Sequence, residues 1–244
     1  MKKLMHDIWR KLVFWVGDIK KIKHFPFVTW HVESHEVSFE EATKALKLIK
    51  AGDIGLHRDS GFLSNFFIGG CFVHGWYHLS SIEVVEAISE GVVKRHSLYP
   101  MHSDMVVILR PKRVNKSDIT EANRKAEAII GCQYDANFKF DIESEIDIVD
   151  TKEVTNVKEN MLKYDKGFSC TEVVSFCWYH MRDQLGIFRK NRSGREIITA
   201  DDFLNNSWEI VWLSASCTSE TCKKLKLPEE GLEMINNYWR KHNA

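Results

Sequence analysis

Residues 71–88 read CFVHGWYHLSSIEVVEAI, two apolar runs separated by a short polar stretch. Aromatic and β-branched residues dominate both runs, and this composition predicts two adjacent strands, at 71–79 and 82–88. Strands that follow each other so closely pair as an antiparallel hairpin. This hairpin is the centre of the sheet that the remaining sequence predicts.

The length of the turn decides which side chains of the hairpin share a face. If His78 lies opposite Ile82, then His74 lies directly beside Glu86 on the same face. A two-residue turn would shift the register by one residue and send Glu86 to the opposite face. A site that uses His74 and Glu86 together therefore requires the longer turn.

Four further segments have the composition of strands and extend the hairpin into a sheet. The runs GVVKR and DMVVILRP, at 91–95 and 104–111, complete an antiparallel meander with the hairpin. The other two strands are expected at 53–57 and 209–214. Helical patterns separate these strands, so the sequence predicts an α+β domain in which an antiparallel sheet packs against helices.

The predicted helices are marked by caps and by apolar residues at helical spacing. Ser38 with Glu41 has the spacing of a capping box, at the start of a helix that ends before Gly52. Asp118 and Glu121 open a second capped helix. Further helices are expected at 60–68, at 170–184 and from Pro228 onward.

The chain has 244 residues and a mass of 28.4 kDa, enough for one substantial core but short of two domains. Lys plus Arg and Asp plus Glu both total 34, so no basic excess attracts a phosphate backbone. Nucleic acid is therefore not expected as a partner. We predict a central domain at 36–215, an N-terminal amphipathic helical extension at 1–35 and a C-terminal helical tail at 216–244.

The N-terminal extension is basic, but it has no long apolar run. Its longest such run, LVFWVG, is too short for a signal peptide or a membrane span, and charged residues follow it at once. Lysines alternate with apolar residues at helical spacing, which predicts an amphipathic helix over residues 1–24. Two environments suit this helix: an anionic membrane surface, or a protein surface of its own domain or of a second copy in a homo-oligomer. The protein surface is favoured, because amphipathic helices mostly face cores.

The six cysteines are scattered and form no CxxC pair. That distribution suits reduced thiols, and hence the cytoplasm, better than a disulfide framework or structural zinc. Cys71, His74 and His78, with His57 in a nearby strand, have the residue types of a zinc site. They lack the spacing of zinc motifs, so no metal or cofactor is expected, and a zinc-binding protein is a minor alternative.

Cys170 stands at the start of the predicted helix at 170–184. A cysteine in the first turn of a helix lies near unpaired N–H groups and the positive end of the helix dipole, which favour its thiolate. A histidine on a neighbouring strand is a suitable proton partner, and a third polar group is needed to orient that histidine. His74 and Glu86 are the residues that the hairpin supplies for these two roles.

Six stretches in this order resemble the permuted NlpC-type cysteine peptidases of the YiiX and YaeF kind, distant relatives of lecithin retinol acyltransferase. The resemblance covers most of residues 46–214 and implies a permuted papain-like fold, in which the histidine precedes the cysteine along the chain. The stretches are LKLIKAGDIGL (46–56), FVHGWYHLSSIEVVEAI (72–88), DMVVILRP (104–111), GCQYD (131–135), FSCTEVVSF (168–176) and IITADDFLNNSWEIV (197–211).

The resemblance also implies roles for individual residues. Cys170 is the nucleophile, His74 its base and Glu86 the residue that orients the base, while Tyr134 is an oxyanion donor or lines the site. The implied activity is that of a cysteine-dependent hydrolase, an amidase or peptidase. Such an enzyme passes through a thioester acyl-enzyme at an amide or ester bond of a peptide, cell-wall fragment or lipid.

Two alternatives share the predicted fold: a lipid acyltransferase or thioesterase, and a peptide- or lipid-binding module without catalysis. Cys177 is left out of the site because it is expected in the core, on the same helix as Cys170. Asp53 and Asp135 are left out as well. They stand at the ends of elements, where short acidic side chains usually bond to nearby backbone.

Overall fold

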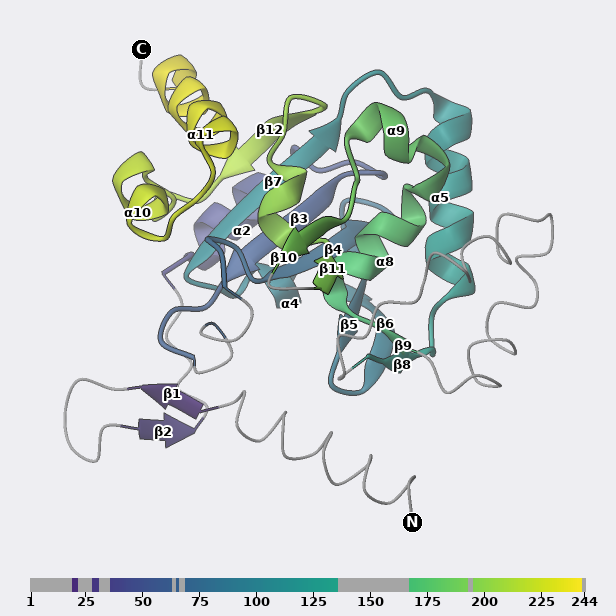
Figure 1. Cartoon of the computed structure of the whole chain (residues 1–244), viewed down its shortest axis with the longest axis horizontal. Helices are drawn as coiled ribbons and strands as arrows, with labels where there is room; N and C mark the ends of the chain where they lie inside the picture. Colours follow the sequence, from purple (N-terminus) through teal and green to yellow (C-terminus); the bar gives the residue numbers. More distant parts are fainter. Residues whose placement is uncertain are drawn as a thin grey trace.

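The computed structural model shows a central sheet with helices on both of its faces (Figure 1). It describes residues 36–62, 65, 69–135, 167–192 and 195–242, together with two short strands at 19–21 and 28–30. All statements below refer to these residues.

The central sheet has six strands, and every neighbouring pair is antiparallel. Their order across the sheet is β12-β7-β3-β4-β5-β6. This arrangement, with helices between and after the strands, confirms the predicted α+β class. The strands are β3 (Ile54–Arg58), β4 (His74–His78), β5 (Glu83–Ile88), β6 (Gly91–His96), β7 (Met105–Pro111) and β12 (Trp208–Leu213).

The predicted meander is correct for β4, β5 and β6 but wrong for β7. Instead of pairing with β6, β7 lies between β3 and β12. The first five residues of β7 are all buried, so this strand needs cover on both faces and hydrogen-bonded neighbours on both sides. An interior position in the sheet supplies both.

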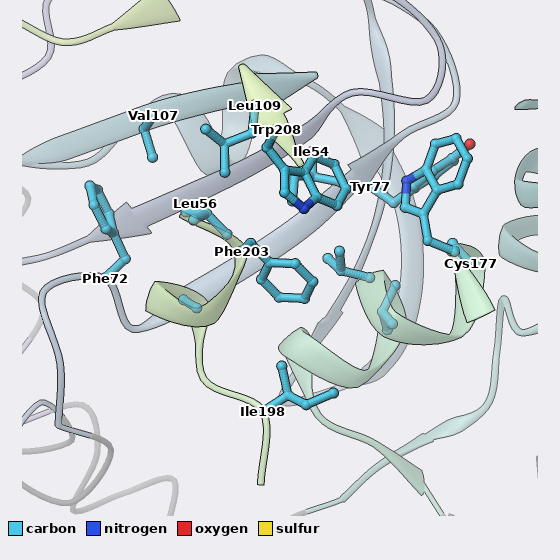
Figure 2. Close-up of a cluster of buried hydrophobic side chains, with 14 of the residues drawn as sticks. Ile54, Leu56, Phe72, Tyr77, Val107, Leu109, Cys177, Ile198, Phe203 and Trp208 are labelled. Atoms are coloured by element: carbon cyan, nitrogen blue, oxygen red, sulfur yellow. The ribbon is translucent and has the colours of Figure 1, made fainter. Parts of the chain in front are cut away.

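One face of the sheet packs against α8 (Cys170–Cys177), which lies in front of the sheet in Figure 1, and α5 (Lys116–Ala128) packs beside α8. The apolar side chains of this face form the larger of two buried clusters. Part of that cluster is drawn in Figure 2, where side chains from the strands meet Cys177 of α8 and Phe203. This packing fixes α8 against β4 and β5.

The other face of the sheet is covered by α2 (Phe39–Leu46) and α4 (Leu98–Met101). Trp76 lies at the centre of this second buried cluster. A Cβ atom at Gly55 would stand 2.0 Å from the Trp76 ring, so only glycine leaves room for the indole there. The two faces thus have separate cores, and β4 contributes to both.

The remaining elements are three helices, two 3₁₀ turns and three strand pairs of the described chain. The helices are α9 (Arg182–Leu185), α10 (Ser219–Lys224) and α11 (Glu229–His242), with 3₁₀ turns at Tyr179–Met181 and Ala200–Phe203. The strand pairs are β1 (Ile19–Lys21) with β2 (Val28–Trp30), β10 (Lys190–Arg192) with β11 (Arg195–Ile197), and the parallel pair β8 (Gln133–Tyr134) with β9 (Gly167–Phe168).

The helix caps agree with the sequence in one place and differ in another. In α2 the Ser38 hydroxyl accepts from the Glu41 amide at 3.2 Å, and the Ser38 amide donates to the Glu41 carboxylate at 3.0 Å, which confirms the capping box. In α5 the cap is Asn115 rather than Asp118. Asn115 accepts from the amides of the first turn, and Asp118 is its partner in the box.

The helix predicted at 170–184 is broken after Cys177. Trp178 leaves helical geometry and buries its indole, which meets the Trp208 ring edge-on at 6.5 Å. A 3₁₀ turn and α9 follow, and α9 ends at Gly186 in the left-handed conformation. The first two turns of the predicted helix, which carry Cys170, are as expected.

The predicted terminal helices have different outcomes. The tail from Pro228 is helical, as α11, and α10 precedes it. At the other end, residues 19–21 form β1, so the amphipathic helix predicted to residue 24 is wrong there, and its remainder lies outside the described residues. Of the helix predicted at 60–68, only 60–62 and 65 are described. Within the described chain, none of the helices combines the length and hydropathy needed to cross a bilayer.

Candidate active site

Cys170 is the first residue of α8, directly after the N-cap residue Ser169. Its thiol is buried, and its Sγ lies 3.9 Å from the carbonyl oxygen of Val73. The backbone N–H groups of Gly75 and Thr171 also interact with the sulfur. The helix N-terminus and the start of β4 therefore both present their backbone to this thiol.

Gly75 lies where α8 packs on β4. A Cβ atom at this position would stand 3.3 Å from Leu56, a tight contact, and 3.6 Å from Val174 of α8, an ordinary one, so a side chain larger than alanine would press on the helix. The Gly75 amide interacts with the Cys170 sulfur. The glycine that follows His74 in the sequence is thus part of what builds the site.

His74 is the first residue of β4 and lies between Cys170 and Glu86. Its Nε2 donates to the Glu86 Oε2 at 2.8 Å, which leaves Nδ1 as the ring nitrogen available to the Cys170 thiol. Burial alone would lower the pKa of His74. The charge and hydrogen bonds of Cys170 and Glu86 outweigh burial and raise the pKa of His74 to about 10.

The pKa of the Cys170 thiol shifts in the opposite direction. Burial would raise the pKa of Cys170, but the neighbouring His74 and the amides of Gly75 and Thr171 lower it below its ordinary value. Because the pKa of His74 is raised and the pKa of Cys170 is lowered, the thiolate–imidazolium pair is favoured over the neutral pair. The geometry therefore suits a nucleophilic sulfur with a proton held beside it.

Glu86 lies on β5, and its side chain is 1% exposed. One carboxylate oxygen accepts from His74 at 2.8 Å, and the other accepts from Arg95 Nε on β6. Burial would raise the pKa of Glu86, but His74 and Arg95 lower it to about 2. Glu86 is thus a buried carboxylate that stays ionised and faces the histidine.

The register of β4 and β5 differs from the predicted one in detail. His78 lies opposite Val84 rather than Ile82, and Tyr77 lies opposite Val85. The turn is longer than a two-residue turn, as the shared site requires. A shift of two residues keeps every side chain on its face, so His74 still meets Glu86, though diagonally rather than directly across the strands.

A second histidine, His57, packs against the His74 ring. The ring of His57 on β3 lies 4.7 Å from the ring of His74, centroid to centroid, and the Trp76 ring lies near both, at 5.6 Å from His57 and 6.4 Å from His74. His57 Nδ1 donates to the Pro100 carbonyl oxygen at 2.9 Å. Burial and the neighbouring His74 lower the pKa of His57, so a neutral ring packs against the charged one.

Tyr134 and Glu172 border the site on the α8 side. Burial raises the pKa of Tyr134 well above its ordinary value, and the nearby Cys170 and Glu172 add to the rise, so its hydroxyl keeps its proton. Glu172 is two residues after Cys170 and is buried. Burial raises the pKa of Glu172 to about 8, although the Ser169 amide donates to its carboxyl at 2.6 Å. At neutral pH it therefore adds little negative charge beside the thiolate.

The residues of the zinc alternative do not assemble around one point. His78 accepts from Trp76 Nε1 at 2.9 Å, and burial lowers its pKa to about 3. Cys71 lies instead beside Cys222, near Cys217. Among the described residues, no three His, Cys, Asp or Glu side chains are placed to hold a metal ion. All six cysteines are free thiols.

Asp53 and Cys177 have the non-catalytic surroundings that the sequence predicts. Asp53 accepts from the Lys50 amide at 2.8 Å and is bound by Arg110 through both carboxylate oxygens, at 2.8 and 2.7 Å. Cys177 is fully buried in the larger cluster, and burial raises its pKa. Asp135 N–H donates to the Phe168 carbonyl at 3.2 Å.

Sequence reasoning missed two residues of this site, Arg95 and His57. Arg95 shares β6 with exposed polar residues and reads as one of them. His57 was weighed only as a zinc ligand, because its support by Pro100 comes from α4, a helix too short to have a periodic pattern. The alternation of side chains along β6 is a weak signal for Arg95. Arg95 lies opposite Val84, and its side chain is therefore on the same face as Glu86.

Comparison of the chain with models of known protein families, with curated proteins and with solved structures gives no match. The assignment of chemistry to this site consequently rests on the residues and their geometry.

Proposed function

We propose that the chain is a cysteine-dependent hydrolase, an amidase or peptidase that acts through a thioester acyl-enzyme, with a permuted papain-like fold of NlpC type. One observation carries the proposal. Cys170, at the N-terminus of α8, interacts with His74, whose other ring nitrogen donates to the buried carboxylate of Glu86. A nucleophile, a base and a group that orients the base are the parts that such chemistry needs.

In the acylation step the Cys170 sulfur attacks the carbonyl carbon of an amide or ester. A C–S bond forms, and the carbonyl electrons move to oxygen. The Cys170 N–H, at the first position of a helix, has no acceptor within that helix and is one donor to the oxyanion. We propose the Tyr134 hydroxyl as the second donor. When the tetrahedral intermediate collapses, the C–N or C–O bond breaks and His74 gives its Nδ1 proton to the leaving group.

In the deacylation step neutral His74 takes a proton from water, whose oxygen attacks the thioester carbon. The C–S bond then breaks, the acid leaves, and the thiolate and imidazolium are restored. Glu86 accepts from His74 Nε2 throughout and stabilises the imidazolium whenever it forms. If an amine or hydroxyl group replaces water in this step, the same site acts as an acyltransferase.

The proposed substrates are amides or esters of a peptide, a cell-wall fragment or a lipid. Six free cysteines support a reducing compartment, and we propose the cytoplasm. Membrane contact through residues 1–24 and association of two copies stay predictions, since that segment is largely outside the described residues.

An acyl probe tests the proposal. Purified full-length protein is incubated with activated acyl esters and amides, and the modified peptide is identified by mass spectrometry. We expect a thioester on Cys170, lost in Cys170→Ala and retained in Cys177→Ala, which removes the other thiol of α8. Labelling at another residue would contradict the proposal. Alkylation of Cys170 by iodoacetamide no faster than that of a free thiol would favour the non-catalytic binding module.

A further inference from the structure

We propose that Arg95 is a positioning residue of this site, which holds one oxygen of the Glu86 carboxylate so that the other faces His74. The inference rests on the proposed function and deepens it by adding a positioning residue behind Cys170, His74 and Glu86. It is carried by a contact that continues from β4 through β5 to β6.

The two oxygens of the Glu86 carboxylate have different partners. Oε2 accepts from His74 at 2.8 Å, and Oε1 accepts from Arg95 Nε. With a hydrogen bond on each oxygen, the carboxylate cannot rotate about its last bond without breaking one of them. Arg95 lies opposite Val84 and therefore shares a face with Glu86, in the diagonal position that a long side chain spans.

Arg95 also supplies a positive charge to the buried Glu86 carboxylate. The Glu86 side chain is 1% exposed, and a buried carboxylate without a partner is costly. Arg95 keeps 32% of its side chain exposed, so it brings a charge to Glu86 without being fully removed from water. A carboxylate that binds both His74 and Arg95 stays ionised. This holds both before and after His74 gives up its proton.

Arg95 is itself held by a contact with Tyr99. The Tyr99 ring lies 5.2 Å from the guanidinium carbon, in a cation–π contact, and the tyrosine itself is 65% exposed. Tyr99 belongs to α4, and the next residue of that helix, Pro100, accepts from the His57 ring at 2.9 Å. This one short helix therefore contacts both Arg95 and His57, the two residues that flank the His74–Glu86 pair.

The same two strands contain a second acid–base pair that lacks these features. Glu83 on β5 and Lys94 on β6 meet at 3.2 Å, with 47% and 44% of their side chains exposed. Such exposed pairs contribute little, because water screens them. Lys94 is thus a matched control for Arg95: it is adjacent in sequence, carries the same charge and contacts no residue of the site in the described structure.

Few other groups near Glu86 titrate. His78 on β4 has a pKa lowered to about 3 by burial, and burial and His74 lower the pKa of His57 on β3. Within the described part of the chain, the charges that meet Glu86 at neutral pH are accordingly those of His74 and Arg95. A pH profile that changes on removal of Arg95 therefore reports on Glu86 and its partner His74.

The test compares Arg95→Met, Arg95→Lys and Lys94→Met in the full-length protein, with an activated acyl ester as substrate. We expect Arg95→Met to lower kcat about tenfold with little change in KM, because the histidine is less well oriented. Without Arg95, Glu86 gains a proton more easily, so the acid limb of the profile should move up by about one pH unit. Arg95→Lys should recover part of the loss, and Lys94→Met should behave as the wild type.

Two outcomes would overturn the inference: Arg95→Met with wild-type kcat and pH profile, or Lys94→Met with the same defect as Arg95→Met. If Arg95→Met fails to fold, Tyr99→Leu at the exposed surface should give a smaller loss in the same direction, and no loss would count against the inference. If the wild type turns over no acyl substrate, the proposed function fails by itself. The His74 Nε2–H resonance then decides the positioning claim, which requires a shift in Arg95→Met and none in Lys94→Met.

Discussion

The two ends of helix α8 each carry a buried cysteine, and their surroundings push the two thiols in opposite directions. Cys170, at the N-terminus, is 7% exposed and meets His74 and the amides of Gly75 and Thr171, which lower its pKa. Cys177, at the C-terminus, is 0% exposed among apolar side chains, and burial raises its pKa. Burial is similar at the two ends, so it cannot explain the difference.

What differs is the set of groups that stabilise a negative charge. The N-terminus of a helix has backbone N–H groups without a partner in the helix and the positive end of the helix dipole, whereas the C-terminus has the negative end. The sheet adds the histidine at one end and apolar packing at the other. A reactive cysteine is therefore a property of its position on the helix together with its partner strand.

The largest effect should come from removing each thiol in turn. Cys170→Ala should lower acyl-ester turnover by a factor on the order of 10⁴ or more, because the nucleophile is lost. Cys177→Ala should keep turnover near the wild-type level and cost only about 1 kcal/mol of stability for the small cavity. Initial rates and urea unfolding measure the two effects. Equal activity loss in both variants would break the comparison.

A smaller effect should follow from neutralising the carboxylate behind His74. Glu86→Gln should lower kcat about 100-fold, because the imidazolium loses its buried counter-charge and Arg95 loses its partner. Glu83→Gln, on the same strand but in an exposed pair with Lys94, is the control and should retain wild-type kcat. A loss of similar size in both would mean that β5 as a whole, and not this carboxylate, matters.

A different effect, on stability rather than on turnover, concerns Glu172, the acid nearest in sequence to Cys170 on α8. Its folded pKa of about 8 lies above the ordinary 4.5, so the folded state holds a proton that the unfolded state releases. Stability should thus fall as pH rises from 4.5 to 8, by at most about 1.4 kcal/mol per pH unit. Glu172→Gln should remove this slope in urea unfolding. Parallel stability curves for the wild type and the variant would contradict a neutral Glu172.

Much of the local structure was predictable, because its cause is local. The Ser38–Glu41 cap and the helical start at Cys170 depend on residues within one turn, and both are as predicted. His74 and Glu86 share a face whenever the register differs from the predicted one by an even number of residues. The observed difference is two residues, so the prediction that they share a face is correct. These features needed no knowledge of the rest of the fold.

Other features depend on contacts between distant segments, and the sequence does not specify those. The continuous apolar run of β7 fits several partners, and nothing local places it beside β3 instead of β6. Arg95 looks like a solvated strand residue until β5 is known to bring Glu86 against it. His57 likewise gains its role from Pro100, which is 43 residues away in the chain. The parts of the site that were missed are those defined by tertiary packing.

The most direct test of the account is the pH dependence of Cys170 alkylation in the wild type and in His74→Ala. With the reaction followed peptide by peptide, the wild-type midpoint should lie below the ordinary thiol value of 9.0, and His74→Ala should move it upward toward that value. Cys177 in the same samples should stay unreactive. Identical Cys170 profiles in the two proteins would show that the imidazole does not act on the sulfur, and the proposed enzyme would have to be abandoned.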